Sequence, residues 1–557
     1  MSLERTADLW WKNAVIYCLD VETFYDSTGD GIGDFAGLTQ CVDYLAGMGV
    51  TCIWLMPFYP SPNRDDGYDL TDHYAIDERL GTFGDFTQFM RTARDRGIRV
   101  IADLVVNHTS SDHPWFQSAR QDPGSRYRDY YVWRDEIPEE GPHGVVFPGE
   151  QESTWTWDDV AGQYYHHRFM EHQPDLNVAN TAVREEIRKV IGFWLAQGLS
   201  GFRVDAVPFF LETEGIAEEM EIAPHDYFRN LCEFLTRRSG EAIMLGEVNV
   251  APDQLGRFFG DEHGDELQML FNFPAMQGLY LGLARQDARP LIDALRSLPA
   301  APAECQWASF VRNHDELTLD KLTDDERQEV FDAFGPEEDM QIYGRGLRRR
   351  LPPMLAGDEE QIRMVYSLMF AMPGAPTIFY GEEIGMGENL AVEGRRSVRT
   401  PMQWTDEPSA GFSTADPGDL RRPLPGGEYG PEHVNVRAQR RDPGSLLNWF
   451  ERMMRLRRDT PEVGWGDWTI LNTGARGLVV IRYDWHGATL VTVHNFAADA
   501  ALVDLDLTDV DWTAARDLLG DDVVEPTADG RLVFEIGRYG YRWMRLETPG
   551  QRSTPYG

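Results

Sequence analysis

The sequence is poor in cysteine, in positive charge and in long apolar runs, and each shortage excludes a class of protein. Cysteine occurs only five times in 557 residues. The five are widely spaced, lie in apolar surroundings and form no CxxC pair, which argues against a disulfide framework or a zinc site. We therefore predict reduced thiols in the cytoplasm at Cys18, Cys41, Cys52, Cys232 and Cys305.

No apolar run is long enough to cross a bilayer. The longest, LMFAMPGAPTIFY after Ser367, is interrupted by Pro373, Gly374 and Pro376 and is shorter than the roughly 20 residues that a spanning helix needs. The first residues, MSLERTADLWWKN, carry charges where a signal peptide needs its apolar stretch. We expect a cytoplasmic protein with no membrane partner.

Positive charge is scarce. Lysine and arginine total 52 against 92 aspartates and glutamates, a formal net charge of -40. Such a field repels phosphate backbones and anionic membranes, so no nucleic acid is expected as a partner. Hydrophobic residues make up 42% of the chain, which is enough for several large cores. Whether the chain forms a homo-oligomer is left open.

Eight short apolar runs alternate with amphipathic helical segments. Most of the runs are nearly continuous in hydrophobicity, as expected of parallel strands that are buried on both faces. Eight such units predict an α/β fold, a (β/α)8 barrel of the TIM type. The runs cover residues 14–24, 50–60, 98–108, 201–207, 242–248, 269–275, 306–315 and 376–383.

Three departures from this alternation predict the domain organisation. The stretch between the third and fourth strands is too long for one helix, so residues 109–178 are expected to form an inserted subdomain. After Asp315, residues 322–334 and 343–355 look helical. Short alternating strands near the C-terminus predict an antiparallel β-sandwich. We expect a barrel over 1–108 and 179–454 and a sandwich over 455–557, with residues of about 405–445 as a long packed loop.

Three carboxylates stand at the carboxyl ends of the predicted strands, where barrel enzymes hold their active sites. They are Asp205, Glu247 and Asp315. One alone could simply pair with a neighbouring Arg or His, but three together favour glycosyl transfer, in which one carboxylate attacks and a second protonates the leaving oxygen. Arg203, two residues from Asp205, is expected to keep it ionised, and Glu247 follows uncharged residues that favour its protonated form.

The motifs around these residues resemble the four signature regions of glycoside hydrolase family thirteen, the α-amylase family. They are DLVVNH (103–108), GFRVDAV (201–207), GEVN (246–249) and VRNHDE (311–316), with further matches in QPDLN (173–177) and PGAPTIFYGEEIGM (373–386). The resemblance implies that Asp205 is the nucleophile, Glu247 the general acid/base and Asp315 a fixed carboxylate that binds sugar hydroxyls. It also implies that the same subsite is lined by Arg203, His108 and His314.

Two further segments, RDDGYDLTDHY (64–74) and SVRTPMQWT (397–405), are similar to family members that act on short α-glucosides. The resemblance implies that Asp65 and Arg399 close the end of the sugar pocket and that Tyr68 stacks beneath the glucose; a plain ion pair on surface loops is the alternative for Asp65 and Arg399. Most similar is the branch that isomerises maltose to trehalose. An exo-acting α-glucosidase and a non-catalytic accessory barrel remain as alternatives. For an isomerase, a lid that excludes water is expected from Trp155, Trp157, Tyr164, Tyr165, His166 and His167.

The acidic loop DSTGDGIGD (26–34) resembles a calcium-binding loop. Related α-glucosidases hold calcium or magnesium there, which implies ligands at Asp26, Thr28, Asp30, the Ile32 carbonyl and Asp34. The resemblance also implies a second calcium at Asn107 and Asp175, with Glu212 as a further candidate. Either ion would be structural, because retaining glycosyl transfer needs no catalytic metal and no organic cofactor.

Overall fold

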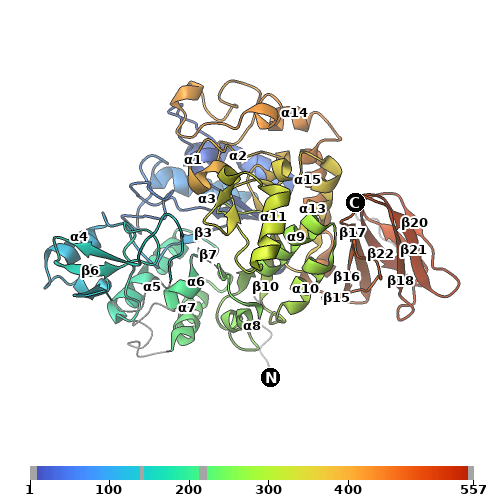
Figure 1. The fold of residues 1–557 in the computed structure, drawn as a ribbon, viewed down its shortest axis with the longest axis horizontal. Helices are drawn as coiled ribbons and strands as arrows, with labels where there is room; N and C mark the ends of the chain where they lie inside the picture. Colours follow the sequence, from blue (N-terminus) through green and yellow to red (C-terminus); the bar gives the residue numbers. More distant parts are fainter. Residues whose placement is uncertain (1–8, 138–143, 212–222, 550–557) are drawn as a thin grey trace.

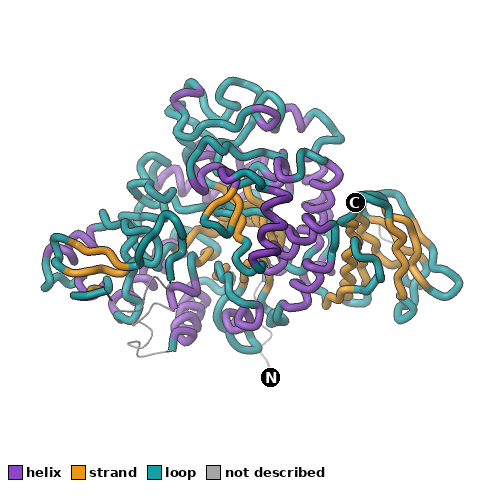
Figure 2. The backbone as a smooth tube through the Cα atoms, in the orientation of Figure 1, coloured by secondary structure: helices purple, strands orange, loops and turns teal. Residues whose placement is uncertain are grey.

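The computed structural model describes residues 9–137, 144–211 and 223–549. Glu212 lies outside them. Eight parallel strands close into a barrel at the centre of the molecule, in the order β1-β14-β10-β9-β8-β7-β3-β2 (Figures 1 and 2). The TIM-barrel prediction is confirmed. Seven of the strands lie within a predicted apolar run, and β14 begins one residue before its run. The strands are β1 (Ile16–Leu19), β2 (Cys52–Leu55), β3 (Arg99–Leu104), β7 (Gly201–Val204), β8 (Ile243–Gly246), β9 (Met269–Phe271), β10 (Gln306–Phe310) and β14 (Ala375–Phe379).

The barrel closes because its strands are apolar on both faces and must be covered by side chains from inside and by helices from outside. The helices that follow the strands have an apolar stripe for this contact; α3, for example, buries Phe86, Phe89 and Ala93. The longer helices are α2 (Phe35–Met48), α3 (Phe83–Asp95), α5 (Thr181–Ala196), α7 (Pro224–Arg238), α9 (Phe273–Arg285), α10 (Arg289–Ser297), α11 (Asp324–Phe334), α13 (Glu359–Ala371) and α15 (Leu446–Arg458). The shorter ones are α1 (Val21–Phe24), α4 (Pro114–Gln121), α6 (Val207–Leu211), α8 (Pro252–Leu255), α12 (Leu351–Met354), α14 (Val436–Arg440) and α16 (Pro461–Trp465).

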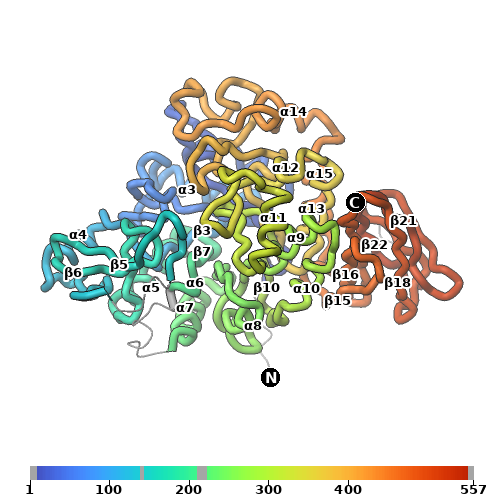
Figure 3. The backbone as a smooth tube through the Cα atoms, in the orientation of Figure 1, coloured from blue at the N-terminus to red at the C-terminus, as the bar shows by residue number. Residues whose placement is uncertain are grey.

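A small antiparallel sheet follows strand β3, and a larger β-structure ends the chain; the two lie at opposite ends of the long axis (Figures 1 and 3). The first has the order β4-β6-β5. It is tied back to the barrel by isolated bridges between His108 and Asp175 and between Tyr131 and Leu176. Its strands are β4 (Trp133–Arg134), β5 (Trp155–Asp158) and β6 (Gln163–His166).

At the C-terminal end, a six-stranded antiparallel sheet faces a two-stranded one across a separate apolar core that includes Val480, Val491, Val503 and Met544. This confirms the predicted antiparallel sandwich. The larger sheet contains β15 (Asp467–Ile470), β16 (Leu478–Trp485), β17 (Ala488–Asn495), β22 (Tyr541–Glu547), β19 (Ala514–Asp517) and β20 (Val523–Val524), and the smaller contains β18 (Ala501–Asp506) and β21 (Arg531–Ile536). The domain boundaries at 108, 178 and 454 stay predictions.

The segment after Asp315 differs in part from its prediction. Residues 324–334 form helix α11, as expected, but 343–355 are mostly not helical. There Tyr343 and Gly344 both have left-handed backbone angles, with φ of 57° and 63°, and Pro352 and Pro353 are tolerated only in the first turn of a helix. Instead the segment supplies β13 (Gly346–Leu347), which joins β11 (Leu317–Thr318) to β12 (Gln341–Ile342).

All five cysteines are buried, as expected for core thiols. In the part of the chain that the structure describes, no helix combines the length and the hydrophobicity that crossing a membrane requires.

Candidate active site

Arg203 on β7 lies at the centre of a group of three carboxylates. Its Nη1 atom is 2.5 Å from Asp103 Oδ1 and 2.5 Å from Asp205 Oδ1, and its Nη2 atom is 2.8 Å from Glu247 Oε2. The guanidinium is 1% exposed. The carboxylates come from the ends of β3, β7 and β8, so closure of the barrel brings together groups that are far apart in the sequence. The predicted convergence of Asp205 and Glu247 is thus observed.

Asp315 follows β10 and is held by two arginines. Its Oδ1 atom accepts hydrogen bonds from Arg395 Nη1 at 2.7 Å and from Arg399 Nη2 at 2.9 Å. Arg395 also contacts Asp65 Oδ1 through Nη2 at 2.8 Å, so it bridges two carboxylates. Arg399 uses its other amine to bind Asp66 Oδ2 at 2.6 Å. The alternative, an ion pair between Asp65 and Arg399, is not observed, because Asp65 pairs with Arg395 and Arg399 pairs with Asp66.

The remaining predicted sugar-site residues form a hydrogen-bonded layer beneath these charges. Tyr68 Oη lies 2.6 Å from His314 Nε2, and the two rings stack with an interplanar angle of 4°. His108 Nε2 lies 3.1 Å from the Tyr68 carbonyl oxygen and 3.3 Å from Gln173 Nε2, which in turn donates to Asp65 Oδ2 at 3.0 Å. Each side chain is thereby fixed before any sugar arrives.

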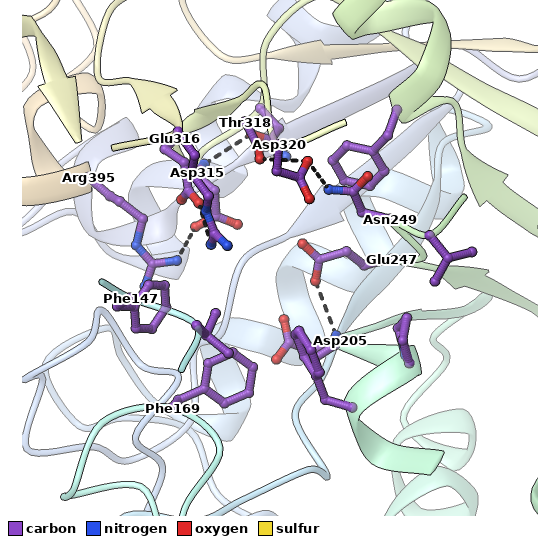
Figure 4. Close-up of a pocket in the computed structure, with 18 of the residues that line it drawn as sticks. Phe147, Phe169, Asp205, Glu247, Asn249, Asp315, Glu316, Thr318, Asp320 and Arg395 are labelled. Atoms are coloured by element: carbon purple, nitrogen blue, oxygen red, sulfur yellow. Dashed lines mark hydrogen bonds and ion pairs between the residues drawn. The ribbon is translucent and has the colours of Figure 1, made fainter. Parts of the chain in front are cut away.

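A cavity of about 380 Å³ opens above this layer. Asp205 and Glu247 reach it from one side, and Asp315 and Arg395 from the other (Figure 4). Its volume is within the range of small-molecule sites. Apart from those four, its lining includes Asp65, Tyr68, His108, Phe147, Phe169, Gln173, Asn249, Glu316, Thr318, Asp320, Lys321 and Arg345.

Three predicted residues support the cavity without lining it. Arg203, His314 and Arg399 are at most 1% exposed and act through the carboxylates and the tyrosine that they contact. Sequence reasoning missed Arg395, although it stands four residues before Arg399 in the same RRSVR segment. No local pattern distinguishes the two arginines.

The aromatic lid prediction was wrong in its residues. The six aromatic and histidine side chains proposed for it lie around β5 and β6, and none lines the cavity. Trp157 is instead 45% exposed. The apolar wall of the cavity comes from two phenylalanines instead. Phe147 lies in the loop between β4 and β5, Phe169 follows β6, and both side chains point toward the cavity (Figure 4).

Burial and charge set different pKa values for the carboxyls. Burial raises the pKa of Asp205 to about 6, against the opposing effect of Arg203. Arg203 was expected to keep Asp205 ionised by lowering its pKa; it does lower the pKa, but desolvation outweighs the ion pair. Burial raises the pKa of Glu247 to about 7, although Arg203 contacts it too. Burial would also raise the pKa of Asp315, but the positive charges of Arg395 and Arg399 hold it below its ordinary value. Burial lowers the pKa of His314 and keeps it neutral, so the two guanidiniums supply the charge.

These values predict a narrow pH optimum. A nucleophilic Asp205 must be ionised, which requires a pH above about 6, and an acidic Glu247 must be protonated, which requires a pH below about 7. We expect kcat/KM to rise with pH through about 6 and to fall through about 7. The measurement is kcat/KM for an aryl α-glucoside from pH 4 to 9. A profile that stays flat from pH 5 to 8 would contradict the assignment of these two groups.

The acidic loop at 26–34 is closed by its own hydrogen bonds. Asp26 accepts backbone N–H groups of Thr28, Gly29 and Gly31, and Asp34 caps helix α2 by accepting from Gly37 N at 2.7 Å. Within the described residues, no three His, Cys, Asp or Glu side chains converge as a metal site requires. Ser413 Oγ also donates to Asp26 Oδ2 at 2.6 Å, so the described hydrogen-bond partners of Asp26 and Asp34 are uncharged groups. The loop is rich in oxygen atoms, which are the ligands that a hard cation prefers.

At the second predicted calcium site, neighbouring protein groups lie close to both carboxylate oxygens of Asp175, and its Oδ2 atom accepts no hydrogen bond from a described residue. Asn107 Nδ2 donates to its Oδ1 at 3.1 Å, and His166 Nδ1 lies 3.1 Å from its Oδ2. Both predicted ligands are thus close together. Calcium at either place stays a prediction.

Comparison with known families agrees with the geometry. Residues 18–333 and 348–466 match the model described as "Alpha amylase, catalytic domain". Residues 487–545 match that described as "Sucrose hydrolase-like, C-terminal domain". The first match spans more than half of the chain. The chain therefore belongs to the α-amylase family, as its motifs predict, and is an enzyme of that family.

Individual proteins of known name are similar to this chain over nearly its whole length. The chain is 38% identical to a trehalose synthase of Pimelobacter sp. (strain R48), over 98% of this chain and 97% of that protein. It is 31% identical to a glucan 1,6-α-glucosidase of Streptococcus pneumoniae, over 93% and 98% respectively. Among solved structures, the trehalulose synthase MutB from Pseudomonas mesoacidophila MX-45 superposes with a TM-score of 0.76 at 27% identity, covering 97% of this chain and 99% of that one.

Proposed function

We propose that this enzyme isomerises maltose to trehalose through a covalent glucosyl-enzyme, with some hydrolysis as a side reaction. The observation that carries the proposal is the cavity itself, which Asp205, Glu247 and Asp315 line together with the ion pair of Asp65 and Arg395. In the proposal this pair closes the end of the sugar pocket, so that a single terminal glucosyl unit is bound. The similarity to a trehalose synthase supports the choice of maltose and trehalose as substrates.

In the proposed mechanism, an Asp205 oxygen attacks the anomeric carbon as the glycosidic bond breaks. Glu247 gives its proton to the leaving oxygen, which yields the glucosyl-enzyme and free glucose. The glucose reorients in the cavity, and its anomeric hydroxyl attacks the same carbon and gives its proton to Glu247. The bond between that carbon and Asp205 breaks as the new bond forms, which frees the Asp205 carboxylate. Asp315 accepts hydrogen bonds from the sugar hydroxyls, and its low pKa keeps it an acceptor throughout.

Retention of the released glucose distinguishes isomerisation from hydrolysis. Phe147 and Phe169 present apolar surface to the cavity, which disfavours a competing water. If water takes the place of the glucose hydroxyl, the same intermediate is hydrolysed. The proportion of the two outcomes therefore depends on how long glucose stays in the cavity.

The test is incubation of the enzyme with maltose and, separately, with trehalose, followed by carbohydrate chromatography. We expect each sugar to be converted to the other, with free glucose as a minor product. Glucose as the sole product from both sugars would refute the isomerase. It would favour the second candidate, an exo-acting hydrolase of α-1,4- or α-1,6-linked di- and oligosaccharides, which the similarity to the glucan 1,6-α-glucosidase supports.

We also propose that calcium or magnesium stabilises the 26–34 loop, with Asp26, Thr28, Asp30, the Ile32 carbonyl and Asp34 as ligands. An ion would neutralise the buried carboxylates of Asp26 and Asp34, whose described hydrogen-bond partners are uncharged. We expect millimolar calcium to raise the Tm by several degrees over EDTA, and Asp30→Asn, which removes the exposed carboxylate of the loop, to reduce that difference. Equal Tm values in calcium, magnesium and EDTA would show that the hydrogen bonds suffice.

A further inference from the structure

One arginine of the long 405–445 segment is buried among exposed neighbours. Arg422 is 7% exposed, whereas Arg421 and Pro423 on either side are exposed. Its Nε atom lies 3.2 Å from Glu22 Oε1, and its Nη2 atom lies 2.5 Å from Asp66 Oδ1. Arg422 does not line the cavity. A buried charge of this kind is costly unless its partners are fixed, so its position requires an explanation.

Asp66 connects Arg422 to the active site. Its Oδ1 atom contacts Arg422, and its Oδ2 atom binds Arg399 Nη1 at 2.6 Å. Arg399 then reaches Asp315 through Nη2 at 2.9 Å. Arg396 also approaches Asp66 Oδ1, at 3.1 Å, but is itself 38% exposed. Arg422 is thus the buried partner that fixes the first oxygen of Asp66, while Arg399 uses the second.

The acidic loop at 26–34 fixes the backbone beside Arg422. Arg421 N donates to the Gly31 carbonyl at 3.1 Å, and Asp26 N donates to the Phe412 carbonyl at 2.9 Å. Gly31 has φ of 86°, and a Cβ atom there would lie 2.5 Å from the Asp419 carbonyl oxygen. The contact is therefore too close for any residue but glycine. In the ribbon view, the 405–445 segment that carries Arg422 lies over helices α1 and α2 (Figure 1).

We infer that Arg422 is a positioning residue for Asp315, acting through Asp66 and Arg399, and that the 26–34 loop sets its place. With Arg422 on Oδ1 and Arg399 on Oδ2, the Asp66 carboxylate cannot rotate, and Arg399 has a fixed anchor. Without Arg422, only the more exposed Arg396 holds Oδ1, so Asp66 and Arg399 gain freedom to shift. A displacement of about 1 Å at a reacting group can cost about 100-fold in rate. The inference rests on the proposed role of Asp315.

The test compares Arg422→Met with Arg79→Met. Arg79 is the matched control because it binds the same Glu22, at 2.8 Å, but pairs with Asp77 rather than Asp66. We expect Arg422→Met to lower kcat by about 10- to 100-fold with KM changed by less than about threefold. Arg422→Lys should recover part of the loss, and Arg79→Met should stay within about threefold of the unmodified enzyme. Each kcat is expressed per active site titrated with a covalent inactivator, so misfolded protein does not count.

A second pair of variants tests the same connection from the loop. Gly31→Ala should displace the segment that carries Arg422 and reproduce the kcat loss of Arg422→Met. Gly47→Ala is the control, because a Cβ at Gly47 meets nothing within 4 Å on helix α2. The double variant of Gly31 and Arg422 should lose little beyond either single variant, since both act through one chain of contacts. Additive losses, or equal losses in the Arg422 and Arg79 variants, would overturn the inference.

Two different activities test the positioning role of Arg422 and the proposed isomerase function separately. Hydrolysis of an aryl α-glucoside needs only the glucosyl-enzyme, whereas conversion of maltose to trehalose needs retention of glucose as well. If the unmodified enzyme hydrolyses the glucoside but makes no trehalose, the isomerase proposal fails and the Arg422 comparison remains valid. If it makes trehalose and Arg422→Met matches Arg79→Met, only the positioning inference fails.

Discussion

Replacement of Asp205 by alanine is expected to lower kcat by about 10⁴- to 10⁶-fold while the fold stays intact. The loss is large because no other described group in the cavity can form the covalent bond from the same place: Asp103 is 0% exposed beneath Arg203, and Arg395 and Arg399 engage Asp315. The fold should persist because Arg203 keeps its contacts with Asp103 and Glu247. The measurements are kcat for an aryl α-glucoside and the Tm.

Azide can separate the role of Asp205 from that of Glu247. In Asp205→Ala the anion can occupy the vacated space and attack the substrate directly, so we expect partial recovery of turnover and a β-glucosyl azide. In Glu247→Ala the anion can attack the glucosyl-enzyme instead, so we expect the α-glucosyl azide. The opposite pairing of products would reverse the two assignments.

A carboxylate outside the cavity provides the control for the Asp205 variant. Asp517 is 4% exposed, lies in the C-terminal sheet and pairs with Arg542 at 3.3 Å. Asp517→Ala removes a buried carboxylate without touching the barrel, so its kcat should stay near that of the unmodified enzyme. If Asp517→Ala lost as much kcat as Asp205→Ala, the loss would follow from removal of any buried carboxylate and not from the role of Asp205 as the nucleophile.

Replacement of Arg203 by methionine is expected to cost about 3–5 kcal/mol in the free energy of unfolding at neutral pH, and most of the activity. Three carboxylates then lose their shared cation inside the barrel. Burial already raises the pKa of Asp103 and Asp205 to about 6 and that of Glu247 to about 7. Without Arg203, which lowers all three, each pKa should rise further, and Asp205 should be largely protonated and inactive at pH 7.

The loss of stability in Arg203→Met should be larger at high pH than at low pH, because folding and proton binding are coupled. A carboxyl whose pKa is higher in the folded state binds more protons there than in the unfolded chain, so stability falls as pH rises from about 4 through the folded pKa. The unmodified enzyme should follow this trend, and Arg203→Met should follow it more steeply and to higher pH. Urea unfolding at pH 5 and pH 8 measures the effect, and the deficit of the variant should be larger at pH 8.

Arg457 offers a matched control for this pH effect. It is a 0% exposed arginine whose amines bind the Gly374 carbonyl and the Asn13 side chain rather than a carboxylate. Arg457→Met should destabilise the enzyme by a similar amount at both pH values. If the Arg203 variant also shows equal deficits at pH 5 and pH 8, the three carboxyls do not depend on Arg203 for their ionisation.

The sequence by itself determined the fold class and the carboxylates of the site. Each barrel strand is a local run of apolar residues, so its existence could be predicted without knowing its neighbours. Asp205 and Glu247 stand at the carboxyl ends of two such strands, and closure of a parallel eight-stranded barrel places those ends at one mouth. The motif resemblance then named their family, which the family match confirms.

Only the tertiary structure decided how the charges pair and how strongly each group is desolvated. The partner of Asp65 proved to be Arg395, 330 residues away, although Arg399 belongs to the same segment and matches the expected motif. The pKa of Asp205 depends on burial as well as on Arg203. Phe147, Phe169 and Arg422 reach their places through loops that carry no periodic pattern. The partner of a charged group and its degree of desolvation depend on all the groups around it. The chain brings those groups together only when it folds, so no local stretch of sequence encodes them.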